Sequence, residues 1–125
     1  MRVFKTRDFA RFARREKLSD AALCEAIARA HRGLIDAARG GGLIKQRVSR
    51  AGAGRSGGYR TLIAYRHEDV SVFVFGFAKN DIGNIEDSDL AKLKTLAAVY
   101  LALDQRLLNA AVDNGKFHEV ICDGV

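Results

Sequence analysis

The sequence predicts an α+β fold in which a small antiparallel β-sheet, arranged as a meander, carries two N-terminal helices and a long C-terminal helix. Residues 43–50, 59–66 and 70–78 show the alternating or continuously apolar pattern of strands, and short polar or glycine-rich segments join them. Segments with helical spacing of apolar residues precede and follow these strands. With 125 residues, 48% of them hydrophobic, the chain can bury a sizeable core, so we expect a single domain over residues 1–125.

The N-terminal third is expected to hold one short strand and two helices. Residues 2–6 are a strand candidate, and a helix with one apolar face follows over residues 9–16. Ser19 is a good N-cap for a second helix, over residues 20–38, in which apolar residues recur at helical spacing. The three glycines at 40–42 are expected to end this helix and turn the chain into the next strand.

The C-terminal half begins with the most apolar segment of the chain. Residues 70–78 should form a central strand covered on both faces. A long helix with an apolar stripe is predicted over residues 88–114, with a possible break near Asp104. Gly115 ends this helix, and residues 117–122 are expected to form a short edge strand or an ordered tail.

The cysteines and the N-terminus indicate the compartment. Cys24 and Cys122 lie far apart in the sequence, and we expect both to be reduced rather than joined. The N-terminus lacks the apolar core of a signal peptide, and no segment is apolar over the length of a membrane span. A cytoplasmic protein without membrane contact is therefore expected. The two cysteines and three scattered histidines lack the spacing of metal ligands, so no metal or other cofactor is predicted.

A glycine-rich segment at residues 52–57 matches the phosphate-binding pattern G-x-G-x-x-G. A dinucleotide site needs this pattern to leave a strand and open a helix. Here it is followed by residues 59–66, which have the pattern of a strand. We therefore interpret residues 51–58 as a flexible loop between two strands.

Positive charge is concentrated in residues 37–67. This window contains seven basic residues and no acidic residue, although the net charge of the whole chain is only +6. Such a single-sign segment indicates an anionic partner, and the phosphate backbone of a nucleic acid is the commonest one.

Four of the basic residues can meet in the predicted sheet. Lys45 and Arg47 lie on one face of their strand because they are two residues apart. Arg60 opens the neighbouring strand and Lys79 ends the third, so in a meander all four can converge near one edge. The alternative is a solvated sheet edge, where lysines discourage edge-to-edge aggregation.

Three segments together resemble the RelE-type toxins of bacterial toxin–antitoxin systems, most closely the RelE/HigB-like branch. They read GLIKQR at 42–47, GRSGGYR at 54–60 and VFGFAKN at 74–80. The resemblance covers most of the chain, from the first strand into the long helix. It implies a RelE-like fold with two N-terminal helices on a small antiparallel sheet and a C-terminal helical element, which agrees with the elements predicted above.

The resemblance also implies a function. Toxins of this type are mRNA interferases, endoribonucleases that cut messenger RNA in the ribosomal A site and are silenced by a cognate antitoxin, here expected to be a small DNA-binding protein. By position in the matching segments, the basic residues of the catalytic cleft would be Lys45, Arg47, Arg60 and Lys79.

The sequence departs from RelE itself at one place. RelE has a tyrosine soon after its last basic residue that stacks on a base, whereas residues 80–84 contain no aromatic residue. Tyr65 or Phe77 could take its place. Other branches use a histidine and a carboxylate near the C-terminus, a part that His118 and Glu119 could play.

The chemistry of the four basic residues suggests their roles. Arg47 and Arg60 would clamp the scissile phosphate, because a guanidinium binds phosphate bidentately. Lys45 would accept the proton of the attacking 2′-hydroxyl, since nearby like charges lower the pKa of a lysine. Lys79 would protonate or stabilise the leaving 5′-oxygen. Further RNA contacts are predicted for Arg50, Arg55, Tyr65 and Arg66.

Three other interpretations compete with a messenger RNA endonuclease. A gyrase-poisoning toxin of the ParE type would share the fold and lack nuclease chemistry. A non-enzymatic nucleic-acid-binding module would bind with steep salt dependence. An antitoxin or regulator is disfavoured because the sequence shows no helix-turn-helix and no acidic disordered tail. The toxin interpretation predicts an antitoxin, the ribosome and messenger RNA as partners, with residues 88–114 as a candidate docking surface for the antitoxin.

Overall fold

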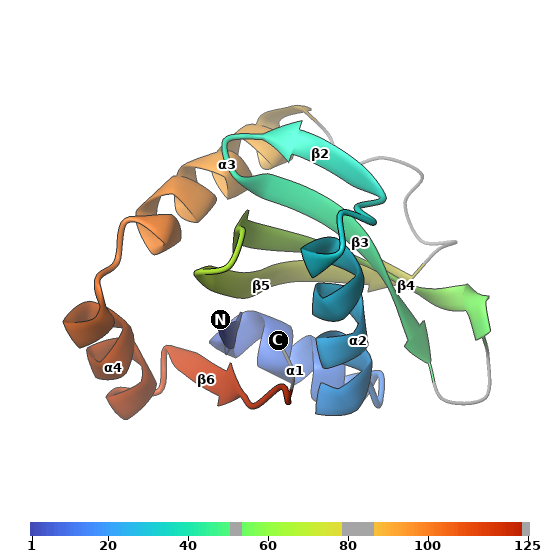
Figure 1. Cartoon of the computed structure of the whole chain (residues 1–125), viewed down its shortest axis with the longest axis horizontal. Helices are drawn as coiled ribbons and strands as arrows, with labels where there is room; N and C mark the ends of the chain where they lie inside the picture. The colour runs from blue at the N-terminus through green and yellow to red at the C-terminus, as the bar shows by residue number, and fades with distance from the viewer. Residues whose placement is uncertain (51–53, 79–86, 124–125) are drawn as a thin grey trace.

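The computed structural model describes residues 1–50, 54–78 and 87–123. This part of the chain is an α+β structure built on one six-stranded mixed sheet (Figure 1). In chain order its elements are β1 (Arg2–Thr6), α1 (Arg7–Arg15), α2 (Asp20–His31), β2 (Ala37–Gly40), β3 (Leu43–Arg50), β4 (Gly54–Arg66), β5 (Val70–Ala78), α3 (Asp87–Leu101), α4 (Gln105–Asp113) and β6 (Phe117–Val120). The strand order across the sheet is β2-β3-β4-β5-β1-β6.

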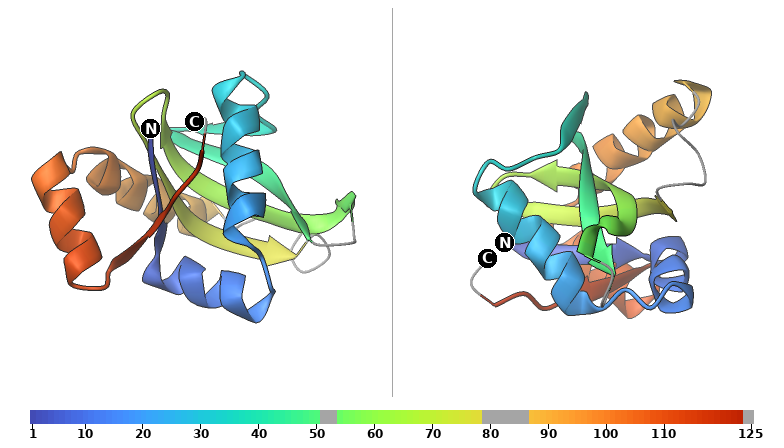
Figure 2. Two further views of the ribbon diagram at one scale, coloured as in Figure 1. Left: turned by 60° about the horizontal axis from the view of Figure 1, so that its bottom comes forward. Right: turned by 90° about the vertical axis from the view of Figure 1, so that its right-hand side faces the viewer.

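Each face of the sheet has its own apolar core. On one face, Phe9 of α1 and Leu23 and Ile27 of α2 pack with buried residues of the central strands. On the other face, Ala97 of α3 and Leu108 of α4 pack in a second cluster with different strand residues. Figure 2 shows α2 and α3 on opposite sides of the sheet. Alternation along the strands therefore decides which helix each side chain meets.

The predicted meander is confirmed, but it is only half of the sheet. Strands β3, β4 and β5 are consecutive and antiparallel, and β3 and β5 have the predicted bounds. Strand β4 begins at Gly54, so the prediction of a loop is wrong for residues 54–58, which belong to this strand, and Gly54 pairs with Arg50 of β3. The expectation of a purely antiparallel sheet is wrong, because β1 pairs parallel with β5 and antiparallel with β6. These pairings join segments that are far apart in the chain, so local sequence patterns do not reveal them.

The second helix is shorter than predicted. Helix α2 ends at His31, and residues 37–40 form the edge strand β2 instead of the helix's last turn. Gly33 follows the helix with a φ of 85°, a left-handed conformation that suits glycine. Gly40, Gly41 and Gly42 also have positive φ values, and they form the turn between β2 and β3 rather than the end of a helix.

The predicted long C-terminal helix is two helices. Helix α3 ends at Leu101, and α4 begins at Gln105. Asp104 separates them as an N-cap, since its carboxylate accepts a hydrogen bond of 2.9 Å from the backbone N–H of Leu107. The expectation of a helix over residues 88–114 is therefore wrong, and the break lies at Asp104, where the sequence allowed one. Strand β6 follows at the edge of the sheet.

The two cysteines form a disulfide bond, which corrects the expectation that both are reduced. Cys24 lies on α2, and Cys122 follows β6, at a sequence separation of 98 residues. Strand β6 runs antiparallel to β1 and returns the end of the chain to α2, where the sulfur atoms meet. The sequence does not reveal that the two cysteines are close, because their proximity depends on the pairing of β6 with the N-terminal strand.

Among the described residues, each helix is too short or too polar to cross a lipid bilayer.

Candidate nucleic-acid interface

Three of the four predicted cleft residues lie together on the face of the sheet that α3 partly covers. Arg47 of β3 is paired directly with Arg60 of β4, and Lys45 lies two residues further along β3, opposite Leu62. An open pocket of about 230 Å³ is lined by Asp36, Lys45, Arg47 and Arg60. The structure thus gathers three cations and one carboxylate around a cavity large enough for a phosphate group.

Alternation along β3 produces this arrangement. Ile44, Gln46 and Val48 are buried on the face that α2 covers. Lys45 and Arg47 point to the opposite face, where they remain partly exposed. The strand is therefore apolar or hydrogen-bonded on one side and cationic on the other, as its sequence predicts.

Asp36 is the residue of this pocket that the sequence analysis missed. It lies just before β2 and one residue outside the basic window. Its Oδ2 atom accepts a 2.7 Å hydrogen bond from the backbone N–H of Arg47 and lies 3.5 Å from the Nε atom of the same residue. One carboxylate thus holds both the backbone and the guanidinium of Arg47. The sequence feature that could have identified Asp36 is that it is a single acidic residue next to a run of basic residues.

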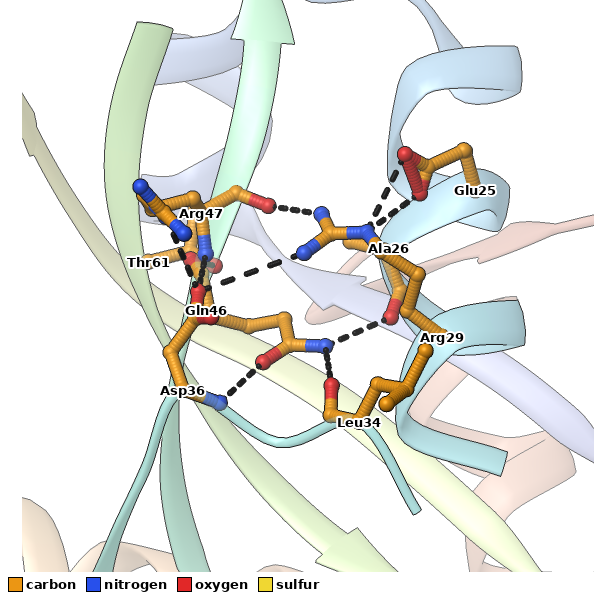
Figure 3. Close-up of polar contacts among 8 residues, drawn as sticks. All are labelled: Glu25, Ala26, Arg29, Leu34, Asp36, Gln46, Arg47 and Thr61. Atoms are coloured by element: carbon orange, nitrogen blue, oxygen red, sulfur yellow. Dashed lines mark hydrogen bonds and ion pairs between the residues drawn. The ribbon is translucent and has the colours of Figure 1, made fainter. Parts of the chain in front are cut away.

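A buried arginine of α2 binds the backbone of β3, as Figure 3 shows. Arg29 of α2 is only 5% exposed. Its guanidinium forms an ion pair of 2.6 Å with Glu25 and donates a hydrogen bond to the backbone carbonyl of Arg47. Asp36 lies 4.0 Å from the Nη1 atom of Arg29. Both backbone polar groups of Arg47 are therefore held by charged side chains, which fixes where its own side chain begins.

Gln46 ties α2 and the segment before β2 to β3, as Figure 3 also shows. Its side chain is fully buried, and its amide donates hydrogen bonds of 3.0 Å to the carbonyls of Ala26 and Leu34. Its side-chain oxygen accepts a 2.9 Å bond from the backbone N–H of Asp36. A buried polar side chain with all these partners satisfied is an effective constraint on geometry. It positions the carboxylate of Asp36 relative to β3.

The pKa of Lys45 is lowered from its ordinary value. Partial burial is the largest cause, and the positive charges of Arg39 and Arg60 add to it. Asp36 opposes the change, because its negative charge favours the protonated amine. Lys45 therefore releases its proton more readily than a solvated lysine, which is a requirement for a proton acceptor near neutral pH.

The other residues predicted to contact RNA either lie away from the pocket or fall outside the described residues. Lys79 and the side chains of Arg50 and Arg55 lie outside them. Arg66 is six residues beyond Arg60 on β4, roughly 20 Å along the strand. Its guanidinium donates to Asp69 and to the carbonyl of Leu101, both at 2.6 Å. The structure therefore does not bring Arg66 to the pocket.

Tyr65 also lies away from the pocket. It is 8% exposed and belongs to the core that α1 and α2 share with the sheet. Its hydroxyl lies 3.1 Å from the Nδ1 atom of His67. Burial raises the pKa of Tyr65, with the charge of Glu68 as a second cause. The ring thus faces the opposite side of the sheet from Lys45.

His118 and Glu119 lie on β6, at the edge of the sheet remote from β2 and β3. Both carboxylate oxygens of Glu119 accept hydrogen bonds of 2.9 Å from Arg2. The hydrogen bond from Arg2 lowers the pKa of Glu119. Strands β5 and β1 separate these residues from β4, so the structure keeps them apart from the cationic pocket. Within the described ranges, histidine, cysteine, aspartate and glutamate side chains form no group of three that could hold a metal ion.

The chain matches a known protein family over nearly its whole length. The family model described as the RelE toxin of the RelE/RelB toxin–antitoxin system matches residues 1–120. This match extends over every helix and strand of the described structure. No protein with a curated description matches the chain.

Proposed function

The chain belongs to the RelE toxin family, and from that premise we propose that it is an mRNA interferase, a toxin that cuts messenger RNA on the ribosome. The observation that supports this proposal is the pocket in which Lys45, Arg47 and Arg60 meet. Three cations around a cavity of this size suit a phosphodiester whose negative charge increases during the reaction. The cytoplasm follows as the compartment, because the ribosome is the proposed site of action.

The proposed reaction uses the RNA's own nucleophile. The 2′-hydroxyl oxygen attacks the adjacent phosphorus, and its proton passes to the neutral amine of Lys45. Arg47 and Arg60 donate hydrogen bonds to the non-bridging oxygens as charge builds on the pentavalent intermediate. The P–O bond to the 5′-oxygen then breaks, and this oxygen takes up a proton, for which Lys79 is the proposed donor. The products are a 2′,3′-cyclic phosphate and a 5′-hydroxyl end.

The side chains that line the pocket explain why the proposed cleavage would need the ribosome. The carboxylate of Asp36 is engaged by Arg47 and by the buried Arg29, so it is poorly placed to act as a base. Of the other described residues that line the pocket, Arg47 and Arg60 stabilise charge and Lys45 accepts a proton, and none of them bends RNA into the in-line geometry that attack requires. We propose that messenger RNA held in the ribosomal A site supplies this alignment, and that free RNA is cut poorly.

The test is cleavage of messenger RNA on programmed ribosomes, with the new ends mapped and their chemistry determined. We expect 2′,3′-cyclic phosphate and 5′-hydroxyl ends on ribosome-bound messenger RNA and little cutting of the same RNA alone. Intact messenger RNA together with DNA damage on induction would favour a gyrase-directed toxin instead. Salt-sensitive binding to nucleic acid with no new ends would favour a binding module without enzymatic activity.

We propose that the partner protein is the cognate antitoxin, as membership of a toxin–antitoxin family suggests. An acidic segment of the antitoxin that covers Lys45, Arg47 and Arg60 would remove the phosphate site directly. Binding to the exposed apolar side chains Leu96 and Val99 of α3 is the alternative route, and both could contribute to one interface.

Removing the charge of Arg39 should slow the proposed reaction at neutral pH. Arg39 lowers the pKa of Lys45, so Arg39→Gln raises that pKa and leaves a smaller neutral, proton-accepting fraction. We expect cleavage at pH 7 to fall about two- to fivefold, the effect of one charge in a partly solvated site. The rise of the rate with pH should also move to higher pH. Single-turnover cleavage on programmed ribosomes between about pH 6 and 9 measures both changes.

Arg39→Lys is the matched control, because it keeps the positive charge at the same position. It should keep the pH profile of the wild type. If the folded Arg39→Gln variant cleaves at the wild-type rate at every pH, or if Arg39→Lys loses as much activity as Arg39→Gln, the positive charge of Arg39 does not act on the proton acceptor.

A further inference from the structure

Four side chains of alternating charge connect the surface of α2 with the cationic pocket (Figure 3). Glu25 of α2 forms an ion pair of 2.6 Å with Arg29. The Nη1 atom of Arg29 lies 4.0 Å from the Oδ2 atom of Asp36, and the same oxygen atom lies 3.5 Å from the Nε atom of Arg47. The charges are therefore negative, positive, negative and positive in turn, and the last of them, on Arg47, lines the pocket.

The buried member of this series holds Asp36 in place. Arg29 lies in the interior, and a buried charge is costly unless opposite charges compensate it. Glu25 and Asp36 provide this compensation from two sides. The side chain of Asp36 is 24% exposed and that of Arg47 is 41% exposed, so the series opens to water at the pocket. Asp36 is thus anchored on its inner side and meets Arg47 on its outer side.

The contact with Asp36 leaves the outer end of the Arg47 guanidinium open. Asp36 approaches this guanidinium at Nε. Within the part of the chain that the structure describes, the two Nη atoms of Arg47 form neither a hydrogen bond nor an ion pair. A guanidinium held at Nε still presents the paired donors of its Nη atoms, and this pair fits two oxygen atoms of one phosphate.

We propose that Asp36 is a positioning residue of the cationic pocket, which holds Arg47 at Nε so that both Nη atoms are directed at the scissile phosphate. The phosphate then adds the next negative charge to the series that begins at Glu25. The inference rests on the proposed function and adds a residue that acts through Arg47 without touching the RNA. An arginine that is already oriented loses less side-chain entropy when the phosphate binds.

Asp36 also acts on Lys45, which provides a second measurement. Asp36 is the one acidic side chain among the described residues that line the pocket. The charges that act on Lys45 are those of Arg39 on β2, Arg60 on β4 and Asp36, and the ammonium group of Lys94 on α3 lies beside the turn at Gly40. Asp36 raises the pKa of Lys45, so loss of its charge lowers that pKa further. The rise of the cleavage rate with pH should then move to lower pH, opposite to the effect of Arg39→Gln.

The first test is Asp36→Asn, which keeps an oxygen to accept the backbone N–H of Arg47 and removes the charge that holds the guanidinium. On programmed ribosomes we expect the maximal single-turnover rate to fall roughly tenfold, within the 10²-fold that a misplacement of about 1 Å can cost. Asp69→Asn is the matched control, because it removes the acidic partner of Arg66 away from the pocket. It should keep the wild-type rate and pH profile.

A double variant shows whether Asp36 acts through Arg47. If it does, adding Asp36→Asn to Arg47→Ala should lower the maximal rate little further, because the two residues work as a unit. The shift of the pH profile should persist in the double variant, since Lys45 is still present. If the two losses multiply instead, Asp36 does not act through Arg47, and the inference is wrong. Thermal unfolding of each variant checks the fold.

Nuclear magnetic resonance separates this inference from the proposed function. The order parameter of the Arg47 Nε–H bond, whose signal is identified by its absence in Arg47→Ala, reports how firmly the guanidinium is held. We expect it to be clearly higher than that of the exposed Arg14 in the wild type and to fall to the level of Arg14 in Asp36→Asn.

An Arg47 Nε–H bond as mobile as that of Arg14 in the wild-type protein would overturn the inference, whether or not any variant folds. An ordered Arg47 that becomes mobile in Asp36→Asn would support the positioning role even in a protein that never cleaves messenger RNA. In that case the proposed function alone would fail.

Discussion

Replacing Arg47 with alanine should lower the rate of messenger RNA cleavage by about 10²-fold or more, the usual cost of losing one donor to a developing negative charge. The guanidinium of Arg47 lines the pocket directly opposite Arg60, and Asp36 holds it there. The interaction grows as the phosphate gains charge, so the loss should appear in the rate on ribosome-bound substrate rather than in binding alone. Single-turnover cleavage on programmed ribosomes measures it.

The fold should tolerate this substitution. The backbone N–H of Arg47 binds Asp36 and its carbonyl binds Arg29, and alanine keeps both groups. Arg14→Ala, which removes one exposed positive charge from α1, is the matched control for net charge and should leave cleavage nearly unchanged. A folded Arg47→Ala variant with wild-type cleavage would show that the pocket is not the reaction centre.

Breaking the disulfide between Cys24 and Cys122 should lower the free energy of unfolding by about 3 kcal/mol or more, because the bond closes a very long loop in the unfolded chain. For a chain of this size, the melting temperature should fall by roughly 10 °C. Urea unfolding with and without dithiothreitol measures the change. If the protein acts in the cytosol, as proposed, where most thiols are kept reduced, its stability there should resemble that of the reduced form.

The double variant Cys24→Ser with Cys122→Ser is the control for this experiment. It should unfold at the lower urea concentration whether or not the reductant is present. Its cleavage activity below the unfolding transition should be unchanged, because the disulfide lies at the β6 side of the structure and the pocket at β3 and β4. A wild-type transition that does not move on reduction would show that the bond contributes nothing to stability.

Local patterns predicted the elements whose structure is decided locally. Strands β3 and β5 have the predicted bounds because the alternation of the first and the continuous apolar run of the second match their burial. Residues 37 and 38 are alanines, which are good helix formers, and their sequence predicts that the second helix continues through them. They form β2 because pairing with β3 outweighs their helix propensity. This pairing depends on the turn at the glycines 40–42, and the same glycines could equally have ended a helix.

In the candidate site, too, only the features that depend on local sequence patterns could be predicted. Lys45, Arg47 and Arg60 could be grouped because their charge and alternation are visible in the sequence. Asp36 could not be placed, because its role depends on where the chain turns after α2.

The position of β1 affects the order in which the protein can be assembled during synthesis. Both of its neighbours in the sheet, β5 and β6, come from later parts of the chain. The hairpins of β3, β4 and β5 can form as soon as these strands leave the ribosome, whereas β1 has no partner until then. Its unpaired N–H and C=O groups stay open to other chains meanwhile, so the first strand to be translated is among the last to be protected from misassembly.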